Sequence, residues 1–254
     1  MQLVMKQILF VVRSSSGDVD VPIILPSNEI PAHTTIILDS GRDKFQKVKS
    51  LNDCSLSEMQ KKALIGLHAL TGCDQNSSFL RKGKLSCWKV LKDNAYQIDA
   101  FVELGSQTNV SDDVSHQIED FVCKLYGEKN VKDVDQARKN IFWRTLKKKK
   151  QVIDLSLLPP CKKSLLLHVS RANYISNIWR QSSTAVMRLD EPQNHGWNDD
   201  YTLRWCDTPY PDDIAEFLVN LNSNHAHIDD IEEEEEIDAE DDVSDIFGDE
   251  DDEI

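Results

Sequence analysis

Apolar residues recur at intervals of three and four between positions 55 and 71. They are Leu56, Met59, Ala63, Leu67 and Leu70. This spacing places them on one face of a helix. Ser55 can cap the first turn, with Glu58 three residues later completing a capping box. The pair Thr71-Gly72 is expected to end the helix, as a C-terminal glycine commonly does.

A second short helix is predicted after a polar loop, where Leu85, Trp88 and Leu91 share a face. The segment Arg81-Lys82-Gly83-Lys84 precedes it. Gly83 is expected to let the backbone turn tightly and come close to a ligand, and amides that open a helix favour phosphate binding. The same helix–turn–helix pattern is also common in helical proteins as plain packing, so the spacing alone leaves both interpretations open.

The first fifty residues have a different pattern. Ile8 to Val12 form a continuous apolar run, which predicts a buried parallel strand. Thr34 to Leu38 predict another strand, and Phe45 to Lys49 alternate like an exposed hairpin arm. Between the strands lies the apolar run Val21 to Leu25, where Pro22 argues against a central strand. We therefore expect an α/β arrangement in this part of the chain.

Acidic residues stand beside these elements. Asp18 and Asp20 follow the first strand, at the place where open α/β sheets put ligands. Asp74 lies just past the end of the predicted helix. Asp39 is a possible further acid, although turn initiation explains it more simply. His68, inside an apolar helix, is interpreted as a core histidine with a hydrogen-bond partner.

Beyond residue 92 the pattern is mostly helical. Amphipathic stretches are centred on 95–105, 111–127, 134–150 and 161–180, the last of them following Pro159-Pro160. Ser111 is expected to cap the second stretch. A short strand is predicted at 202–205 and a last helix from Pro211.

Two features in this region have more than one interpretation. The block Lys147 to Lys150 can be a solvated helix end, a nuclear import signal or a phosphate contact, and the first is the default for so short a motif. Trp179, Trp197 and Trp205 can be stacking platforms for nucleic acid. Holding a small subdomain together is the simpler role for them.

Charge separates the tail from the rest of the chain. The net charge is −15, yet 17 of the acidic residues lie between Asp229 and Ile254 with no Lys or Arg among them. The remaining residues carry 27 acids and 29 bases. Acids at such density repel one another and offer little apolar surface, so residues 229–254 are expected to be disordered.

Cysteine spacing and hydropathy indicate the cellular compartment of the protein. None of the six cysteines forms a Cys-x-x-Cys pair, so no zinc site is indicated. The apolar run near the N-terminus is too short for a signal peptide, and no stretch approaches the length of a membrane span. We expect an intracellular protein with reduced thiols, nuclear or cytoplasmic, that is neither secreted nor associated with a membrane.

The segment Leu67 to Asp74, followed by Gly83-Lys84 and an apolar helix, resembles the helix-hairpin-helix region of flap endonucleases and other XPG-type 5′ nucleases of the PIN-like superfamily. From Arg13 to Leu221 the chain is similar to transposon-associated PIN-like proteins of animals. The resemblance implies DNA, structured or single-stranded, as the partner. Its implied nucleic-acid-binding residues are Arg81, Lys82, Gly83 and Lys84. Its implied metal ligands are Asp18, Asp20 and Asp74, holding Mg²⁺ or Mn²⁺ if the chain is active.

Two departures from that family bear on activity. Flap endonucleases carry another acid two residues after the position of Asp74, and this chain has Asn76. Their sheet also begins well before the segment that matches Asp18. We therefore expect the C-terminal part of a PIN-like domain with its helix-hairpin-helix at 1–92, a helical extension at 93–150, a small helical/β subdomain at 151–228 and the acidic tail at 229–254.

The expected function is that of a nucleic-acid-binding, nuclease-like protein that is catalytically incomplete as this chain. Two alternatives remain open. The chain can be a non-catalytic interaction protein whose acidic tail binds basic proteins, or a genomic remnant without a function of its own. Four segments recur in the transposon-associated relatives without a role that the sequence reveals: 158–161, 171–174, 178–180 and 195–197.

Overall fold

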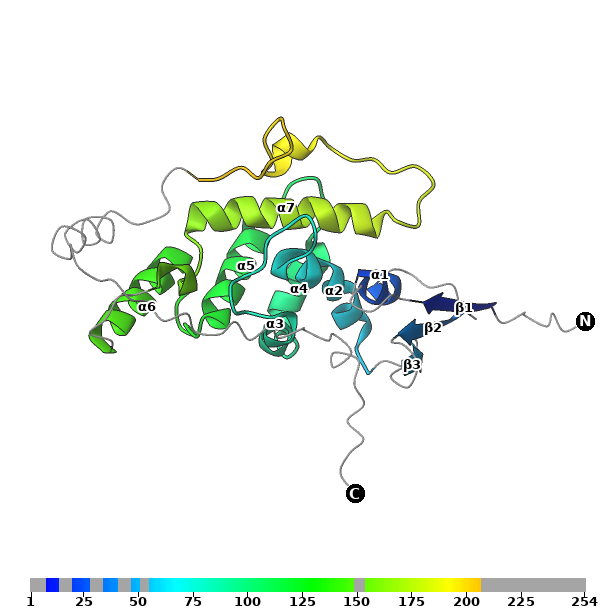
Figure 1. Cartoon of the computed structure of the whole chain (residues 1–254), viewed down its shortest axis with the longest axis horizontal. Coiled ribbons are helices and arrows are strands. Elements are labelled where there is room, and N and C mark those ends of the chain that lie inside the picture. Colours follow the sequence, from blue (N-terminus) through cyan, green and yellow to red (C-terminus); the bar gives the residue numbers. More distant parts are fainter. Residues whose placement is uncertain are drawn as a thin grey trace, which may run out of the picture.

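The computed structural model of the chain describes residues 8–13, 20–27, 34–40, 47–50, 55–148 and 154–206. Helices make up most of it, and a small sheet lies at one end of the helical assembly (Figure 1). The expectation of an α/β fold is confirmed in its coarse form, since helices and strands are both present and the first strand pair is parallel. Helices prevail, however, because the elements that follow β3 in the described part of the chain are all helices.

The sheet has three strands in the order β1 (Ile8–Arg13), β2 (Thr34–Ser40) and β3 (Lys47–Ser50). β1 and β2 are parallel, as predicted, with Ile8 opposite Thr34. β2 and β3 are antiparallel, which confirms the hairpin arm over its described residues. Asp39 lies near the end of β2 with its side chain buried, and the turn that it was expected to start lies outside the described residues.

The apolar run after β1 forms a helix, α1 (Asp20–Ser27). Pro22 falls in the first turn of α1, where its missing N–H breaks no helical hydrogen bond. Asp20 is the first residue of this helix, and negative charge is favourable there. The helix thus accommodates Pro22, the residue that argued against a central strand.

Helix α2 (Glu58–Thr71) lies in the middle of the assembly and packs against α1, α4 (Ala95–Glu103) and α7 (Lys162–Arg180). Because neighbours surround it, all residues from Ala63 to Thr71 are buried. Met59, predicted to face inward, is 44% exposed near the amino end.

The amino end of α2 is capped by Ser57, and the predicted pair Ser55 and Glu58 was wrong. Ser57 Oγ accepts from Gln60 N, and Gln60 Oε1 accepts from Ser57 N. This capping box is the predicted motif shifted by two residues, because Ser57, in extended backbone, directly precedes the first helical residue.

The remaining helices follow in the predicted order, and the predicted Ser111 cap of α5 is confirmed by its hydrogen bond from Val114 N. They are α3 (Lys84–Leu91), α5 (Asp112–Leu125) and α6 (Val134–Lys148). The short 3-10 helices η2 (Leu155–Leu157) and η3 (Pro192–His195) were not predicted. The lysine block begins at the end of α6, and Lys149 and Lys150 lie outside the described residues.

A large hydrophobic core joins these helices. It runs from Ile23 in α1 to Trp197 beyond η3, and it includes the edge-to-face pair Phe101 and Phe121 at 4.9 Å. Predicted segments 1–92, 93–150 and 151–228 all contribute side chains to it. Within the described residues, no helix combines the length and hydropathy needed to cross a membrane.

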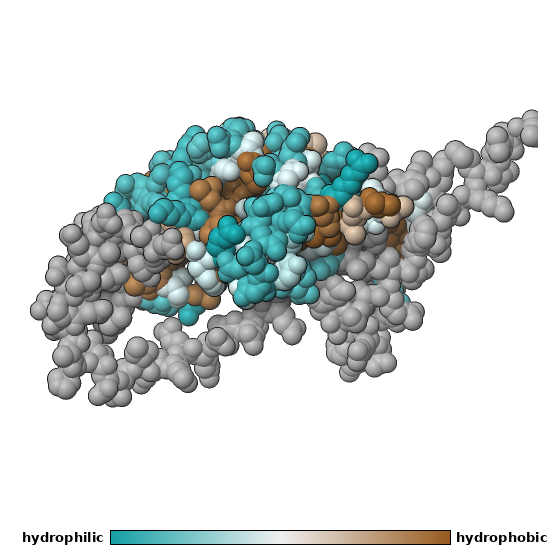
Figure 2. Space-filling view, turned by 90° about the horizontal axis from the view of Figure 1, so that it is seen from above, coloured by the Kyte–Doolittle hydropathy of each residue, from teal (hydrophilic) through white to brown (hydrophobic). Residues whose placement is uncertain are grey.

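The last described segment folds back over α7, at the top of the view in Figure 1. The predicted strand 202–205 was wrong: the segment makes an isolated bridge between Trp197 and Leu203. From above, the described surface is largely hydrophilic with apolar patches (Figure 2). The helix predicted from Pro211 and the acidic tail lie outside the described residues.

Candidate nucleic-acid interface

The turn between α2 and α3 carries the four residues that the sequence singles out for nucleic-acid binding. Lys82 N donates to Phe79 O and closes the turn. The backbone reverses at Arg81, which has a φ of 56°, and Gly83 has an ordinary φ of −64°. Gly83 was expected to make the tight turn itself. That expectation was wrong, because the unusual backbone conformation falls two residues earlier.

The amino end of α3 differs from those of its neighbours. Gly83 is its N-cap residue and supplies no side-chain hydrogen bond to the helix, whereas Ser57, Asn94 and Ser111 cap α2, α4 and α5. The first-turn amides of a helix have no intrahelical partners, and the helix dipole adds partial positive charge at the same place. The arrangement favours an anion at the start of α3.

The three cationic side chains of the turn have different surroundings. Lys84 Nζ lies 2.6 Å from Gly72 O, at the end of α2. The ammonium of Lys82 lies 4.9 Å from the centre of the Tyr126 ring. The Arg81 side chain is exposed. The structure therefore assigns Lys84 and Lys82 contacts within the fold and presents Arg81 to the outside.

Asp20, one of the three predicted metal ligands, lies against His68. His68 Nε2 donates to Asp20 Oδ1 over 2.6 Å, and this hydrogen bond is the largest cause that lowers the pKa of Asp20 below its usual range. His68 itself is buried and stacks on Trp179 at 5.1 Å. The interpretation of His68 as a core histidine with a partner is confirmed.

Of the other two predicted ligands, only Asp74 belongs to the described residues. Asp74 is exposed at the end of α2, and Asp18 lies outside the described residues. In the part of the chain that the structure describes, no three His, Cys, Asp or Glu side chains come together as a metal-binding group. Among the described residues, Asp20 is paired with a histidine instead of with further acids.

Asn76, the position where flap endonucleases carry an acid, has a structural role. It is 4% exposed. Its Nδ2 donates to Ala69 O over 2.9 Å, and its Oδ1 accepts from Arg171 Nε over 3.2 Å. Arg171 is also buried, which lowers its pKa. An amide can donate to the α2 carbonyl and accept from arginine at once, whereas an ionised carboxylate only accepts.

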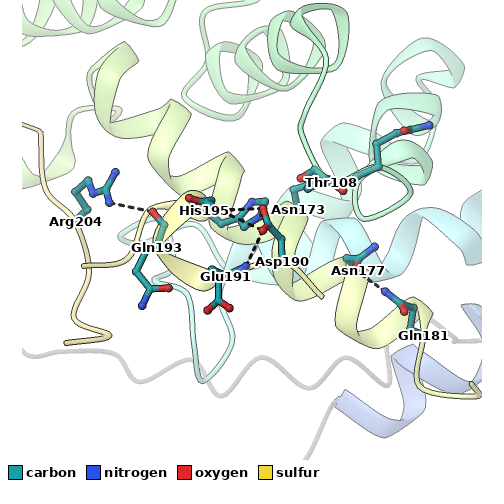
Figure 3. A network of polar contacts seen from close by, with 11 residues as sticks. Thr108, Asn173, Asn177, Gln181, Asp190, Glu191, Gln193, His195 and Arg204 are labelled. Atoms are coloured by element: carbon teal, nitrogen blue, oxygen red, sulfur yellow. Dashed lines mark hydrogen bonds and ion pairs between the residues drawn. The ribbon is translucent and has the colours of Figure 1, made fainter. Parts of the chain in front are cut away.

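Polar side chains along α7 hold the loops around it (Figure 3). Asn173 accepts from Gly105 N and donates to Gln107 O and Thr108 O, which fixes the loop after α4. Arg180 Nε donates to Leu104 O over 2.7 Å, so a cation lies at the carboxyl end of α4. The motif at 171–174 and the arginine of 178–180 are therefore structural.

The segment after α7 is held by a second set of polar contacts. Asp190 Oδ2 lies 3.2 Å from His195 Nε2, and Arg204 Nη2 donates to Gln193 O (Figure 3). Of the three tryptophans expected to hold a subdomain together, Trp179 and Trp197 pack against the main core, and Trp205 is 76% exposed. Two of the tryptophans thus have a packing role, although in the core common to all three predicted segments, and Trp205 does not share it.

Comparisons of the whole chain with protein-family models, with curated proteins and with solved structures found no match.

Proposed function

We propose that this chain binds duplex DNA through the sugar–phosphate backbone, at the turn that contains Arg81, Lys82, Gly83 and Lys84. One observation carries the proposal: the exposed Arg81 side chain stands two residues before the amino end of α3, which no described side chain caps. A guanidinium group binds phosphate through paired N–H donors. The helix end adds amides and positive potential.

Each of the three cations has a separate role in this proposal. Lys84 holds α3 to the end of α2 through Gly72 and so fixes where the helix end points. Lys82 keeps its charge near the turn while its ammonium rests on the Tyr126 ring. Arg81 makes the direct phosphate contact.

A carboxylate on a neighbouring segment lies within range of the Arg81 charge. The pKa of Asp154, which precedes η2, is lowered by hydrogen bonds from Ser156 and, to a smaller extent, by the charge of Arg81. The positive charge of Arg81 therefore acts on the Asp154 carboxylate. A phosphate would compete with Asp154 for that charge.

The proposal contains no cleavage step, because no group of three His, Cys, Asp or Glu side chains that could hold a metal occurs in the described part of the chain. Phosphate contacts position a protein on DNA without reading bases. Binding should therefore be independent of sequence.

Fluorescence anisotropy with labelled duplexes of unrelated sequence tests the proposal at low salt. The full chain should bind all duplexes with similar affinity, and Arg81→Gln should weaken binding to each of them. Lys129→Gln removes the same charge from an exposed residue after α5 and serves as the control. Absence of binding, or equal effects of the two substitutions, would contradict the proposal.

A further inference from the structure

Two cysteine sulfurs that are distant in sequence lie side by side. Cys161 Sγ and Cys206 Sγ are 3.5 Å apart, across 45 positions of the chain. Both residues carry thiols that are not joined in a disulfide. The wide spacing of the cysteines conceals this pair in the sequence, because only the return of the chain over α7 brings the two residues together.

The fold holds both thiols in place. Cys161 is buried at the N-cap position of α7. Cys206 lies two residues after Arg204, and both backbone polar atoms of Arg204 are hydrogen-bonded. Arg204 N donates to Gly196 O, and Arg204 O accepts from Arg171 Nη1. Cys206 is partly exposed, so a reagent in solution can reach one sulfur of the pair.

We propose that Cys161 and Cys206 form a reversible disulfide by exchange with a low-molecular-weight disulfide such as oxidised glutathione. The Cys206 thiolate attacks the reagent, forms a mixed disulfide and releases one glutathione thiolate. The Cys161 thiolate then attacks the Cys206 sulfur and releases the second. The cysteine pair is oxidised by two electrons, the reagent is reduced, and the two thiol protons end on two molecules of glutathione.

The crosslink joins the start of α7 to the end of the segment that η3 and Arg204 hold against it. A disulfide restricts the unfolded chain, and the effect grows with the length of the loop that it closes. Oxidation should therefore raise the melting temperature of the protein. It should also protect the segment after η3 from proteases.

Incubation of the full chain with mixtures of oxidised and reduced glutathione, followed by alkylation, peptide mapping and thermal unfolding, tests the proposal. We expect a peptide pair linked through Cys161 and Cys206, a higher melting temperature and reversal of both by a reducing agent. Cys87 and Cys123 are fully buried and should stay reduced. Cys206→Ser should show neither the link nor the rise in melting temperature on oxidation.

Cys161→Ser provides a second variant that should fold, because serine is a favourable N-cap residue. It should lack the link and instead keep glutathione on Cys206. The proposal is overturned if the parent chain retains glutathione on Cys206 without closing the bridge. It is also overturned if neither thiol reacts, or if the linked peptides contain other cysteines.

Discussion

Lys84 Nζ lies 2.6 Å from the main-chain oxygen of Gly72, so the first residue of α3 closes the end of α2. A cation at the carboxyl end of a helix is favourable for its dipole and its last carbonyl groups. This contact spans the turn that we propose as the DNA-binding element. The contact therefore fixes the geometry of the turn and should also stabilise the fold.

Replacement of Lys84 by methionine should therefore destabilise the protein. Lys84→Met keeps much of the apolar stem but leaves the Gly72 carbonyl without this donor, and we expect a loss of ~1–2 kcal/mol in the free energy of unfolding. Urea denaturation measures it. Lys89→Met, at an exposed position of the same helix, should stay within about 0.5 kcal/mol of the parent. Equal values for both variants would refute the role of Lys84 as a cap.

Asn76→Ala should lower the free energy of unfolding more than Lys84→Met does. Three buried partners of the Asn76 side chain lose a hydrogen bond. Ala69 O and His168 O lose a donor, and Arg171 Nε loses its acceptor. We expect a loss of about 2–3 kcal/mol in the free energy of unfolding. Ser78→Ala, on the exposed part of the same loop, is the matched control. A loss no greater than that of the control would show that the Asn76 contacts contribute little.

The free energy of unfolding should decrease as the pH is lowered below 6.5, because of His168. Burial lowers the pKa of His168 from 6.5 to about 4, and its Nε2 donates to Leu70 O. Between these two values the unfolded chain holds more protons than the folded one. The free energy of unfolding should therefore decrease by up to ~3 kcal/mol as the pH falls from 6.5 to about 4.

His168→Gln tests this dependence, since glutamine retains an N–H donor for Leu70 O and does not titrate. Urea denaturation across that pH range should give a flatter profile for His168→Gln than for the parent. His116→Gln, at an exposed position of α5, should leave the profile unchanged. Parallel profiles for parent and His168→Gln would exclude His168 as the source.

Removal of residues 229–254 should increase DNA affinity at low salt. These residues carry 17 acids, while the rest of the chain has 29 bases and 27 acids. The acidic charge repels DNA and competes for the cations of the body, and added salt should reduce the gain by screening. Anisotropy titrations of both chains at several salt concentrations measure it. An unchanged affinity at low salt would rule out competition by the tail.

The sequence predicted the helices after residue 55 well because each has a local signal. The apolar spacing of α2 apart from Met59, the Ser111 cap of α5 and Pro159-Pro160 before α7 agree with the structure. Val21 to Leu25 lacked such a signal. A five-residue apolar run fits a strand or a buried helix equally well, and the helix α1 is formed there in contact with α2.

The candidate site was harder to predict because its contacts are distant in sequence. His68 meets Asp20 across 48 positions, and Arg171 meets Asn76 across 95. Neither pair produces a periodic pattern in the sequence. The sequence did locate the turn between α2 and α3 that carries the candidate residues. It did not show that Asp20 is held by a histidine or that Arg81, rather than Gly83, has the positive φ.

The salt dependence of duplex binding by Arg81→Gln tests the central claim most directly. Removal of one phosphate-binding cation should reduce the magnitude of the slope of log K against log salt by ~0.9. We predict this reduction for Arg81→Gln on every duplex, and a slope equal to that of the parent for Lys129→Gln. Arg81→Lys keeps the charge and should keep the slope. Equal slopes for the parent, Arg81→Gln and Lys129→Gln would contradict a phosphate contact at this turn.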